Sequence, residues 1–315
     1  MRVPSLLFVA VVSLCAFDAL AVPRAFVSAV NGSDLNPCSR AQPCRSFAAA
    51  VLVTDVDGEV IPIDSAGFGV VTITQSVSIV SPLGVDAGIT GGAGDAILVA
   101  AGNSDHVTLK NLYINSQGAD TGINADTVGA LYVDGCVING FGTGILFNPS
   151  ANSRLYVSNT FVRRSSSVGI EVVGGLSIRA TIESVRLHGN SFGVLVQNAE
   201  ATIRKSAASG GAQGFTVGMS GKLTIEDSIS TANGYGFFAN GGGVMALTRC
   251  AAASNTNAGI EAITSPTIIY VADCTITANA IGVDTTAGGV VTSRSNNTLQ
   301  ANTNDGAFTN TFPPS

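Results

Sequence analysis

Residues 169–217 show the unit from which the chain is built: GIEVVGGLSIRATIESVRLHGNSFGVLVQNAEATIRKSAASGGAQGFTV. Within it, a glycine followed directly by an apolar residue recurs at Gly169-Ile170, Gly193-Val194 and Gly214-Phe215. Along the chain these pairs belong to a series of nine at intervals of 21 to 25 residues, at Gly122-Ile123, Gly144-Ile145, Gly169-Ile170, Gly193-Val194, Gly214-Phe215, Gly236-Phe237, Gly259-Ile260, Gly282-Val283 and Gly306-Ala307. A period of this length is typical of repeat architectures.

Each repeat contains two segments in which apolar residues alternate with other residues. After the glycine, the first and third positions are apolar, as in Ile145/Phe147 and Ile170/Val172, whereas an upstream segment alternates similarly at Leu155/Val157. This alternation is typical of strands with one buried face. The segments are rich in Val, Ile and Thr rather than in helix-forming residues. The pattern therefore predicts an all-β chain, a parallel β-helix solenoid with about 23 residues per coil.

The repeat pattern resembles that of the right-handed parallel β-helix superfamily, the pectate-lyase-like folds, over about residues 58–306. The preceding segment, from Phe26 to Phe47, is similar to the N-terminal part of secreted bacterial members, which are mostly known only as repeat-containing proteins of undefined activity. The resemblance implies that residues 46–54 form a short helix that caps the first coil. Ser46 is a suitable N-cap, and Phe47, Ala50 and Val51 offer an apolar face.

Four regions are predicted: a signal peptide at 1–21, a cap at 22–57, the β-helix at 58–306 and a flexible tail at 307–315. A positive start, a short apolar core and the small-x-small sequence Ala19-Leu20-Ala21 predict the signal peptide. A lipoprotein anchor at Cys15 is disfavoured because Leu14 precedes it. We therefore expect a secreted protein, extracellular or periplasmic, without a transmembrane segment after cleavage. The last coil is expected to slip or fray, because Thr292 and Arg294 occupy positions that are apolar elsewhere.

The repeat glycines and nearby asparagines are expected to shape the corners of the coil. Each glycine precedes a strand, where either a positive φ or a missing Cβ would be useful. Asn190, Asn233 and Asn279 each lie three residues before a repeat glycine. Stacked asparagines hydrogen-bond along a fibre or coil axis, so these residues are interpreted as structural.

Five cysteines remain after the predicted cleavage. Cys38 and Cys44 lie in a Pro-containing loop of a chain predicted to be secreted, so a disulfide between them is expected rather than a metal site. Cys136, Cys250 and Cys274 fall in one inward column. In-register stacking would hold the Cβ atoms of Cys250 and Cys274 about 4.8 Å apart, longer than a disulfide prefers, which favours buried free thiols.

The composition and motifs exclude several functions. A net charge of −6 and a pI of about 4.8 argue against a nucleic-acid partner. The catalytic motifs of polygalacturonase-like members do not occur, and the chain has no Trp for the signature of the pectate lyases.

The strongest carboxylate pair is Glu261 and Asp284, which the repeat places outward on adjacent coils. That spacing suits a retaining glycosidase or a Ca²⁺ ion, although two solvated acids on a wall explain it equally well. No other cofactor is expected.

A second outward column carries Tyr and Thr, and it lies four residues before the cysteine column. Its members are Thr108, Tyr132, Tyr156, Thr181, Thr202, Thr224, Ala246, Tyr270 and Ser293. Tyr132, Tyr156, Thr181 and Tyr270 are candidate contacts for sugar rings. Tyr and Thr are also residues that strands prefer on half-exposed faces, so a purely structural role is the alternative.

These observations predict a secreted or envelope protein, non-catalytic, that contacts a polysaccharide or cell-surface glycan along the Tyr/Thr face. The rival hypothesis is a polysaccharide lyase or glycoside hydrolase that uses Glu261 and Asp284. A passenger or adhesin fragment is a third possibility.

Overall fold

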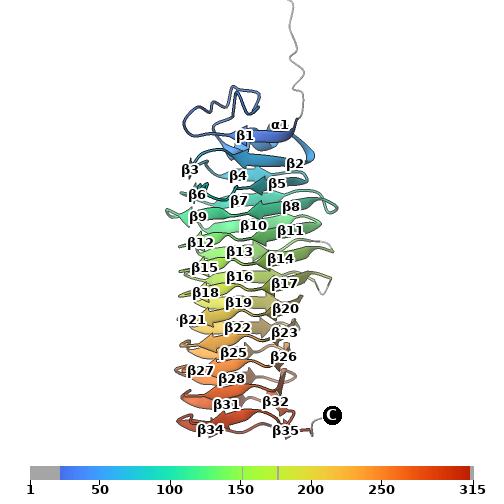
Figure 1. Ribbon diagram of the computed structural model, residues 1–315. Coiled ribbons are helices and arrows are strands. Elements are labelled where there is room, and N and C mark those ends of the chain that lie inside the picture. The colour runs from blue at the N-terminus through green and yellow to red at the C-terminus, as the bar shows by residue number, and fades with distance from the viewer. Residues whose placement is uncertain (1–21, 151, 176, 313–315) are drawn as a thin grey trace, which may run out of the picture.

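The computed structural model describes residues 22–150, 152–175 and 177–312, so the predicted signal peptide lies outside the described residues. Parallel strands stack into a tall coil with three faces (Figure 1). We refer to the faces as sheets A, B and C. Within the described residues, the model has one helix, α1 (Phe47–Val53), and 35 strands.

The strands of each sheet are listed here in their order along the coil axis. Sheet A contains β1 (Val22–Val27), β2 (Thr54–Pro62), β5 (Val77–Val80), β8 (His106–Lys110), β11 (Ala130–Asp134), β14 (Arg154–Ser158), β17 (Arg179–Glu183), β20 (Glu200–Arg204), β23 (Lys222–Glu226), β26 (Val244–Thr248), β29 (Ile268–Ala272), β32 (Val290–Ser293) and β35 (Asn310–Thr311). Sheet B contains β3 (Ala66–Gly67), β6 (Ala87–Gly91), β9 (Leu112–Ser116), β12 (Val137–Asn139), β15 (Phe161–Arg163), β18 (Arg186–His188), β21 (Ala207–Ser209), β24 (Ile229–Thr231), β27 (Ala251–Ala253), β30 (Thr275–Thr277) and β33 (Thr298–Gln300). Sheet C contains β4 (Val71–Ile73), β7 (Asp95–Ala100), β10 (Thr121–Thr127), β13 (Thr143–Phe147), β16 (Val168–Val173), β19 (Phe192–Gln197), β22 (Gln213–Gly218), β25 (Tyr235–Ala239), β28 (Ala258–Ile263), β31 (Ile281–Thr286) and β34 (Asn304–Gly306).

The predicted inward positions are buried and stack in register. On sheet C, Ile145, Ile170 and Val194 pair in successive coils, and each is fully buried. Phe215 and Phe237 continue this column with stacked rings whose centroids lie 5.6 Å apart. The two-residue alternation read from the sequence thus fills the bore with hydrocarbon, which supplies the main drive for folding.

The repeat glycines avoid a collision between coils. None of the eight from Gly122 to Gly282 has a positive φ. A Cβ added at any of them would lie less than 3.0 Å from a backbone carbonyl oxygen of the next coil. Of the two predicted roles, the missing Cβ is therefore the one observed.

Left-handed residues lie elsewhere, and one column of them stands at the turn from sheet A to sheet B. Seven non-glycine residues of this column adopt φ of 48 to 56°, at Asn111, Asn159, Ser184, Lys205, Asp227, Arg249 and Asp273. Six of their amides donate to a backbone carbonyl of the next coil, as Asn159 does to Glu183, whereas the Asp273 amide donates to the Asn296 side chain. These inter-coil bonds offset the cost of a left-handed non-glycine residue.

Buried asparagines form a ladder between sheets B and C. Asn233, Asn255 and Asn279 are at most 2% exposed, and each Oδ1 accepts an amide N–H from the preceding coil. The Nδ2 groups donate to backbone carbonyls, and those of Asn255 and Asn279 also donate to the next asparagine. The structural role predicted for Asn190, Asn233 and Asn279 is confirmed, and Asn255 and Asn302 also belong to the ladder.

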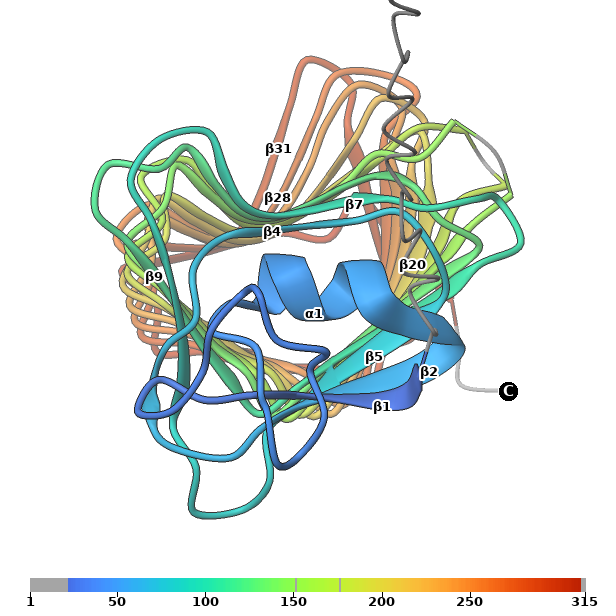
Figure 2. The same cartoon turned by 90° about the horizontal axis from the view of Figure 1, so that it is seen from above.

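The capping helix closes the bore as predicted. Figure 2 shows α1 lying across the end of the coil, where Phe47, Ala50 and Val51 are buried. The Ser46 side chain accepts a hydrogen bond from the amide of Ala49, and Asp34 accepts the Ser46 amide and hydroxyl. Although burial works against it, these hydrogen bonds lower the pKa of Asp34.

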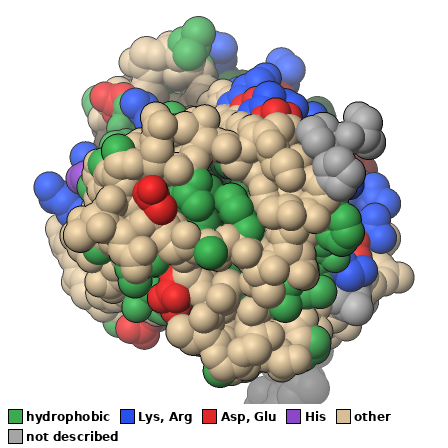
Figure 3. Space-filling view, turned by 90° about the horizontal axis from the view of Figure 1, so that it is seen from below, with side chains coloured by type: hydrophobic (Ala, Val, Ile, Leu, Met, Phe, Trp, Pro, Cys, Tyr) green, Lys and Arg blue, Asp and Glu red, His purple; other side chains and the backbone are tan. Residues whose placement is uncertain are grey.

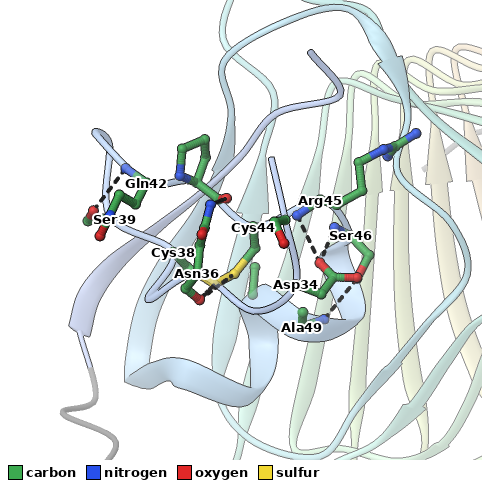
Figure 4. The surroundings of a disulfide bond; sticks show 12 residues. Asp34, Asn36, Cys38, Ser39, Gln42, Cys44, Arg45, Ser46 and Ala49 are labelled. Atoms are coloured by element: carbon green, nitrogen blue, oxygen red, sulfur yellow. Dashed lines mark hydrogen bonds between the residues drawn. A yellow bond between two sulfur atoms is a disulfide. The ribbon is translucent and has the colours of Figure 1, made fainter. Parts of the chain in front are cut away.

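The predicted disulfide joins Cys38 to Cys44 in the loop over α1 (Figure 4). Both residues are buried, and the loop is held further by the Asn36 side chain, which donates to the Pro43 carbonyl. Cys136, Cys250 and Cys274 are buried and free, as expected.

The coils near the C-terminus differ from the predicted alignment. Gly306 pairs with Val283 rather than with Gly282, and Tyr270 pairs with Thr292 rather than with Ser293. The last coil has thus slipped, as expected. However, β35 continues sheet A past the predicted end of the β-helix at residue 306. Figure 3 shows this end of the coil, with apolar side chains visible near its centre.

Candidate functional site

The outer face of sheet A forms a shallow trough whose floor is the Tyr/Thr column. Tyr132, Tyr156 and Thr181 pair in register on adjacent coils, and Thr202 and Thr224 follow them. Tyr270 lies three coils beyond Thr202, next to Ala246. The structure therefore joins three of the four candidate contacts and places the fourth apart from them.

Tyr132 and Tyr156 stack on each other. Their ring centroids lie 4.8 Å apart and the ring planes differ by 5°. Because each ring covers one face of the other, this pair presents mainly edges and hydroxyl groups to solvent. Tyr270 is 44% exposed and has a small neighbour in Ala246, so its ring is the more accessible one.

Several depressions lie in a row along the trough. One of about 230 Å³ is lined by Arg154, Tyr156, Arg179 and Thr181, and the next, about 320 Å³, includes Arg179, Thr202, Lys222 and Thr224. A further depression lies beside Arg154 at the turn that leads into sheet A, where Gly129 and Ser153 line it and no member of the Tyr/Thr column does. Another, of about 380 Å³, surrounds Tyr270 and includes Ala246 and Arg294. The floor is made of Thr and Tyr, whereas long charged side chains form the rims.

Ion pairs between coils order these rims. On one side Glu200 bridges Arg179 and Lys222, at 3.5 and 3.0 Å. On the other side Arg204 pairs with Glu226 at 2.7 Å, in a column where acidic and basic residues alternate from coil to coil. These groups are substantially exposed, so the pairs contribute little to stability. Their main effect is to hold the rim side chains beside the floor.

The second candidate site lies on sheet C. Glu261 and Asp284 pair directly across β28 and β31, as the repeat predicts. Glu261 is only 8% exposed, so the interpretation of two solvated acids is wrong for this residue, whereas Asp284 is half-buried. Burial, and secondarily the Asp284 carboxylate, raise the pKa of Glu261. Its Oε2 is buried without a hydrogen-bond partner among the described residues.

Aromatic residues cover Glu261 on the preceding coil. Phe238 pairs with Glu261 in register and is 7% exposed, and its ring lies 5.3 Å from that of Tyr235 in a tilted arrangement. Phe238 was missed in the sequence, although its position two residues after Gly236 marks the same column. Glu171, in this column but four coils away, also has a pKa raised by burial.

The donor set of the carboxylate pair does not suit calcium. The described part of the chain holds no cluster of three or more His, Cys, Asp and Glu side chains that could bind a metal. Ca²⁺ takes six to eight oxygen ligands, whereas this pair provides two carboxylates, and Phe238 occupies the next position of the column.

The remaining nucleophilic or titratable candidates have structural explanations. Burial raises the pKa of Cys136 to about 12, and the hydrogen bond with Cys274 together with burial raises that of Cys250. Neither thiol is therefore activated at neutral pH. His188 is exposed on sheet B, and its Nδ1 lies 3.0 Å from the Ser209 hydroxyl. In the described ranges, no helix has the length and apolar character needed to cross a membrane.

Comparison with known proteins supports the fold. The family described as right handed beta helix region matches residues 174–311. A search of curated proteins found no match. Among solved structures, the pectate lyase Pel9A is 15% identical with a TM-score of 0.52, covering 93% of this chain and 79% of its own. A GH136 lacto-N-biosidase from Eubacterium ramulus is 12% identical with a TM-score of 0.64, covering 92% of this chain and 66% of its own.

At these identities the two neighbours establish the architecture and leave the chemistry open. The described chain therefore folds as an all-β parallel β-helix solenoid, and its residues 174–311 match the right handed beta helix family.

Proposed function

We propose that this protein is a secreted or envelope β-helix protein that binds an extended polysaccharide along the trough of sheet A. The observation that carries the proposal is the row of two adjoining depressions from Tyr156 to Thr224. They follow the Tyr/Thr column across three coil-to-coil steps, which corresponds to roughly 14 Å at the spacing of paired strands. A row of this kind suits a linear polymer better than a compact ligand.

The chemistry of the trough supports a glycan. Threonine hydroxyls both donate and accept hydrogen bonds, and they stand one coil apart at Thr181, Thr202 and Thr224. Sugar hydroxyls have the same dual character. The Tyr132–Tyr156 edges and the exposed ring of Tyr270 add amphipathic contacts. The Cys38–Cys44 disulfide supports an oxidising compartment, extracellular or periplasmic.

A glycan array followed by calorimetry tests the proposal. Replacing Thr181 and Thr202 together with Val keeps the shape and strand preference but removes two hydroxyls. Binding of a glycan hit is expected to weaken about tenfold or more, since each lost hydrogen bond costs about 1 kcal/mol. The matched control replaces Thr275 and Thr277, outward on β30 of sheet B, and should bind as the wild type does. No hit on a broad array, or equal weakening in the control, would refute the proposal.

The second candidate is a carbohydrate-active enzyme, favoured by the buried Glu261 beside Asp284. A carboxyl group with a raised pKa next to a more exposed carboxylate is the arrangement of a general acid and a nucleophile. In-register strands lie about 4.8 Å apart, close to the ~5–5.5 Å of retaining glycosidases. Glu261 would protonate the glycosidic oxygen while Asp284 attacks the anomeric carbon. The deprotonated Glu261 would then activate water to release the sugar.

Two assays separate these functions. Reducing-sugar release from neutral oligosaccharides would reveal a hydrolase, and absorbance of unsaturated products from uronic-acid polymers would reveal a lyase. Activity that is lost in Glu261→Gln and Asp284→Asn but kept in Glu171→Gln would support the carboxylate site. Activity that survives both substitutions would exclude it.

A further inference from the structure

A cluster of basic residues on sheet B is distinct from both candidate sites. It consists of Arg163, Arg164, Arg186 and His188, which come from β15, the residue after it, and β18 on the next coil. The strand register places Arg163 beside His188 and Phe161 beside Arg186. We name these four residues the sheet B basic cluster. Basic side chains and a histidine lie together at the left edge of Figure 3, the side that sheet B occupies in Figure 1.

The arginines of this cluster lack carboxylate partners. None of the ion pairs among the described residues includes Arg163, Arg164 or Arg186. On sheet A, by contrast, Arg179, Arg204 and Lys222 each reach an acid on an adjacent coil. The guanidinium groups of Arg163 and Arg186 share the Phe161 ring, and two uncompensated positive charges this close repel one another. The chain has a net charge of −6, so this cluster is a positively charged patch on a protein that is negative overall.

Phe161 holds two of these groups in place. The guanidinium carbons of Arg163 and Arg186 lie 5.4 and 5.2 Å from the centroid of the Phe161 ring. Contacts of this kind contribute about 0.5–1 kcal/mol at exposed sites and keep a guanidinium plane against the surface. The ring carries no net charge, so the positive charge of both arginines is left to attract an anion.

The half-buried Arg163 has an open hydrogen-bond donor. Its Nε is shielded from solvent and has no acceptor among the described residues. Buried polar groups are nearly always hydrogen-bonded, so this Nε–H is an unsatisfied donor within the described chain. His188 lies on the next coil, and the Ser209 hydroxyl at its Nδ1 orients the ring. When that hydroxyl donates, Nε2 carries the proton and is a further donor.

We propose that the sheet B basic cluster binds a phosphate or sulfate ester group of a ligand. Arginine forks match tetrahedral oxyanions and form charge-assisted hydrogen bonds to them. Three guanidinium groups and an imidazole on two adjacent coils match the several oxygens and high charge density of a phosphate or sulfate better than a single carboxylate. This site is independent of the trough on sheet A.

Nitrogen–proton NMR spectra of the arginine Nε–H groups in the whole chain test this site. Inorganic phosphate and inorganic sulfate are titrated first, followed by glucose 6-phosphate against glucose, and dextran sulfate against uncharged dextran. The Arg163 Nε–H signal is expected to shift saturably with the charged member of each pair. Binding should weaken about tenfold or more in the double variant Arg163→Gln/Arg186→Gln, because each charge-assisted bond contributes about 1.5–3 kcal/mol.

The control variant is Arg24→Gln/Arg249→Gln, which removes the same charge from ion-paired positions elsewhere. It should bind as the wild type does, and both variants should keep the wild-type circular dichroism. Three results would overturn the proposal: no saturable shift with either anion, equal weakening in the control, or a preference for polygalacturonate over dextran sulfate. Binding of sulfate without phosphate, or the reverse, would identify which ester the cluster takes.

Discussion

Glu261 and Asp284 pair in register across β28 and β31, yet Glu261 is 8% exposed while Asp284 is half-buried. Both carboxylates follow a repeat glycine by two residues. The difference in burial arises from the neighbours in the column, because Phe238 lies beside Glu261 on the other side. Burial, and secondarily the Asp284 carboxylate, raise the pKa of Glu261, although the two acids look equivalent in the sequence.

The free energy of unfolding should decrease as the pH rises, because Glu261 is buried in the folded chain. Its pKa in the folded chain is raised above the ordinary value of 4.5, chiefly by burial. Below pH 4.5 the folded and unfolded chains both hold the proton. Above it the unfolded chain releases the proton first, so stability falls until the raised pKa is passed. Melting temperatures from about pH 4 to about pH 8 should decline more for the wild type than for Glu261→Gln. Parallel curves for the wild type and Glu261→Gln would contradict the burial of this carboxyl group.

Gly169→Ala should destabilise the coil without altering any polar group. The new Cβ would lie 2.6 Å from the Gly193 carbonyl oxygen and 3.0 Å from the Leu187 side chain. Overpacking of this kind costs about 1–3 kcal/mol. Gly92→Ala is the control, because a Cβ there meets nothing within 4 Å. Urea unfolding measures both, and an equal change in the two variants would argue against close approach as the role of the repeat glycines.

Asn255→Ala should break the asparagine ladder. The substitution leaves the Asn233 amide and the Ser230 carbonyl without partners in a site that is 1% exposed. Each unsatisfied buried group costs about 1–3 kcal/mol. The exposed Asn152 provides the comparison, and its alanine variant should unfold within about 0.5 kcal/mol of the wild type. If Asn255→Ala were as stable as the Asn152 variant, the hydrogen bonds of the ladder would make no net contribution to the free energy of unfolding.

Loss of the Cys38–Cys44 disulfide should loosen the cap. Closing so short a loop is worth about 2 kcal/mol by the chain-entropy estimate. The double Ser variant is therefore expected to show faster amide exchange in residues 28–53 than the wild type, with the coils beyond them unchanged. Treatment of the wild type with a reductant should reproduce the effect, because Cys136, Cys250 and Cys274 are already free. Equal exchange throughout would mean that the loop is held by its hydrogen bonds alone.

Much of the architecture could be predicted because the repeat is local and the pattern is redundant. Ile170 and Val172 were assigned to the interior from two-residue alternation, and both are fully buried. Ser46, Phe47, Ala50 and Val51 form the cap that the family resemblance implied. The alignment of the repeats breaks in the last coil, as expected, because one residue shifts the register. Gly306 resembles a repeat glycine but pairs with Val283, since the last coil is one residue out of step.

The arrangement of each candidate site depends on which residues of the neighbouring coil lie beside it. Tyr132 and Tyr156 were correctly placed on adjacent coils, but only the structure shows that their rings face each other. The cluster around Arg163 and Arg186 was missed because the search followed columns of like residues, and these arginines stand in two different columns. Comparing the sign of charge on neighbouring coils would have detected it.

By itself, the amino-acid sequence determined that this chain coils, how many residues each turn takes, and which side chains face inward. These properties follow from alternation and period, which act over a few residues and repeat many times. Only the tertiary structure decided that the repeat glycines avoid a clash, that Glu261 is buried, and that three arginines share one surface. Those outcomes depend on atoms more than 20 residues apart in sequence but one strand spacing apart in space, where a shift of one residue replaces every neighbour.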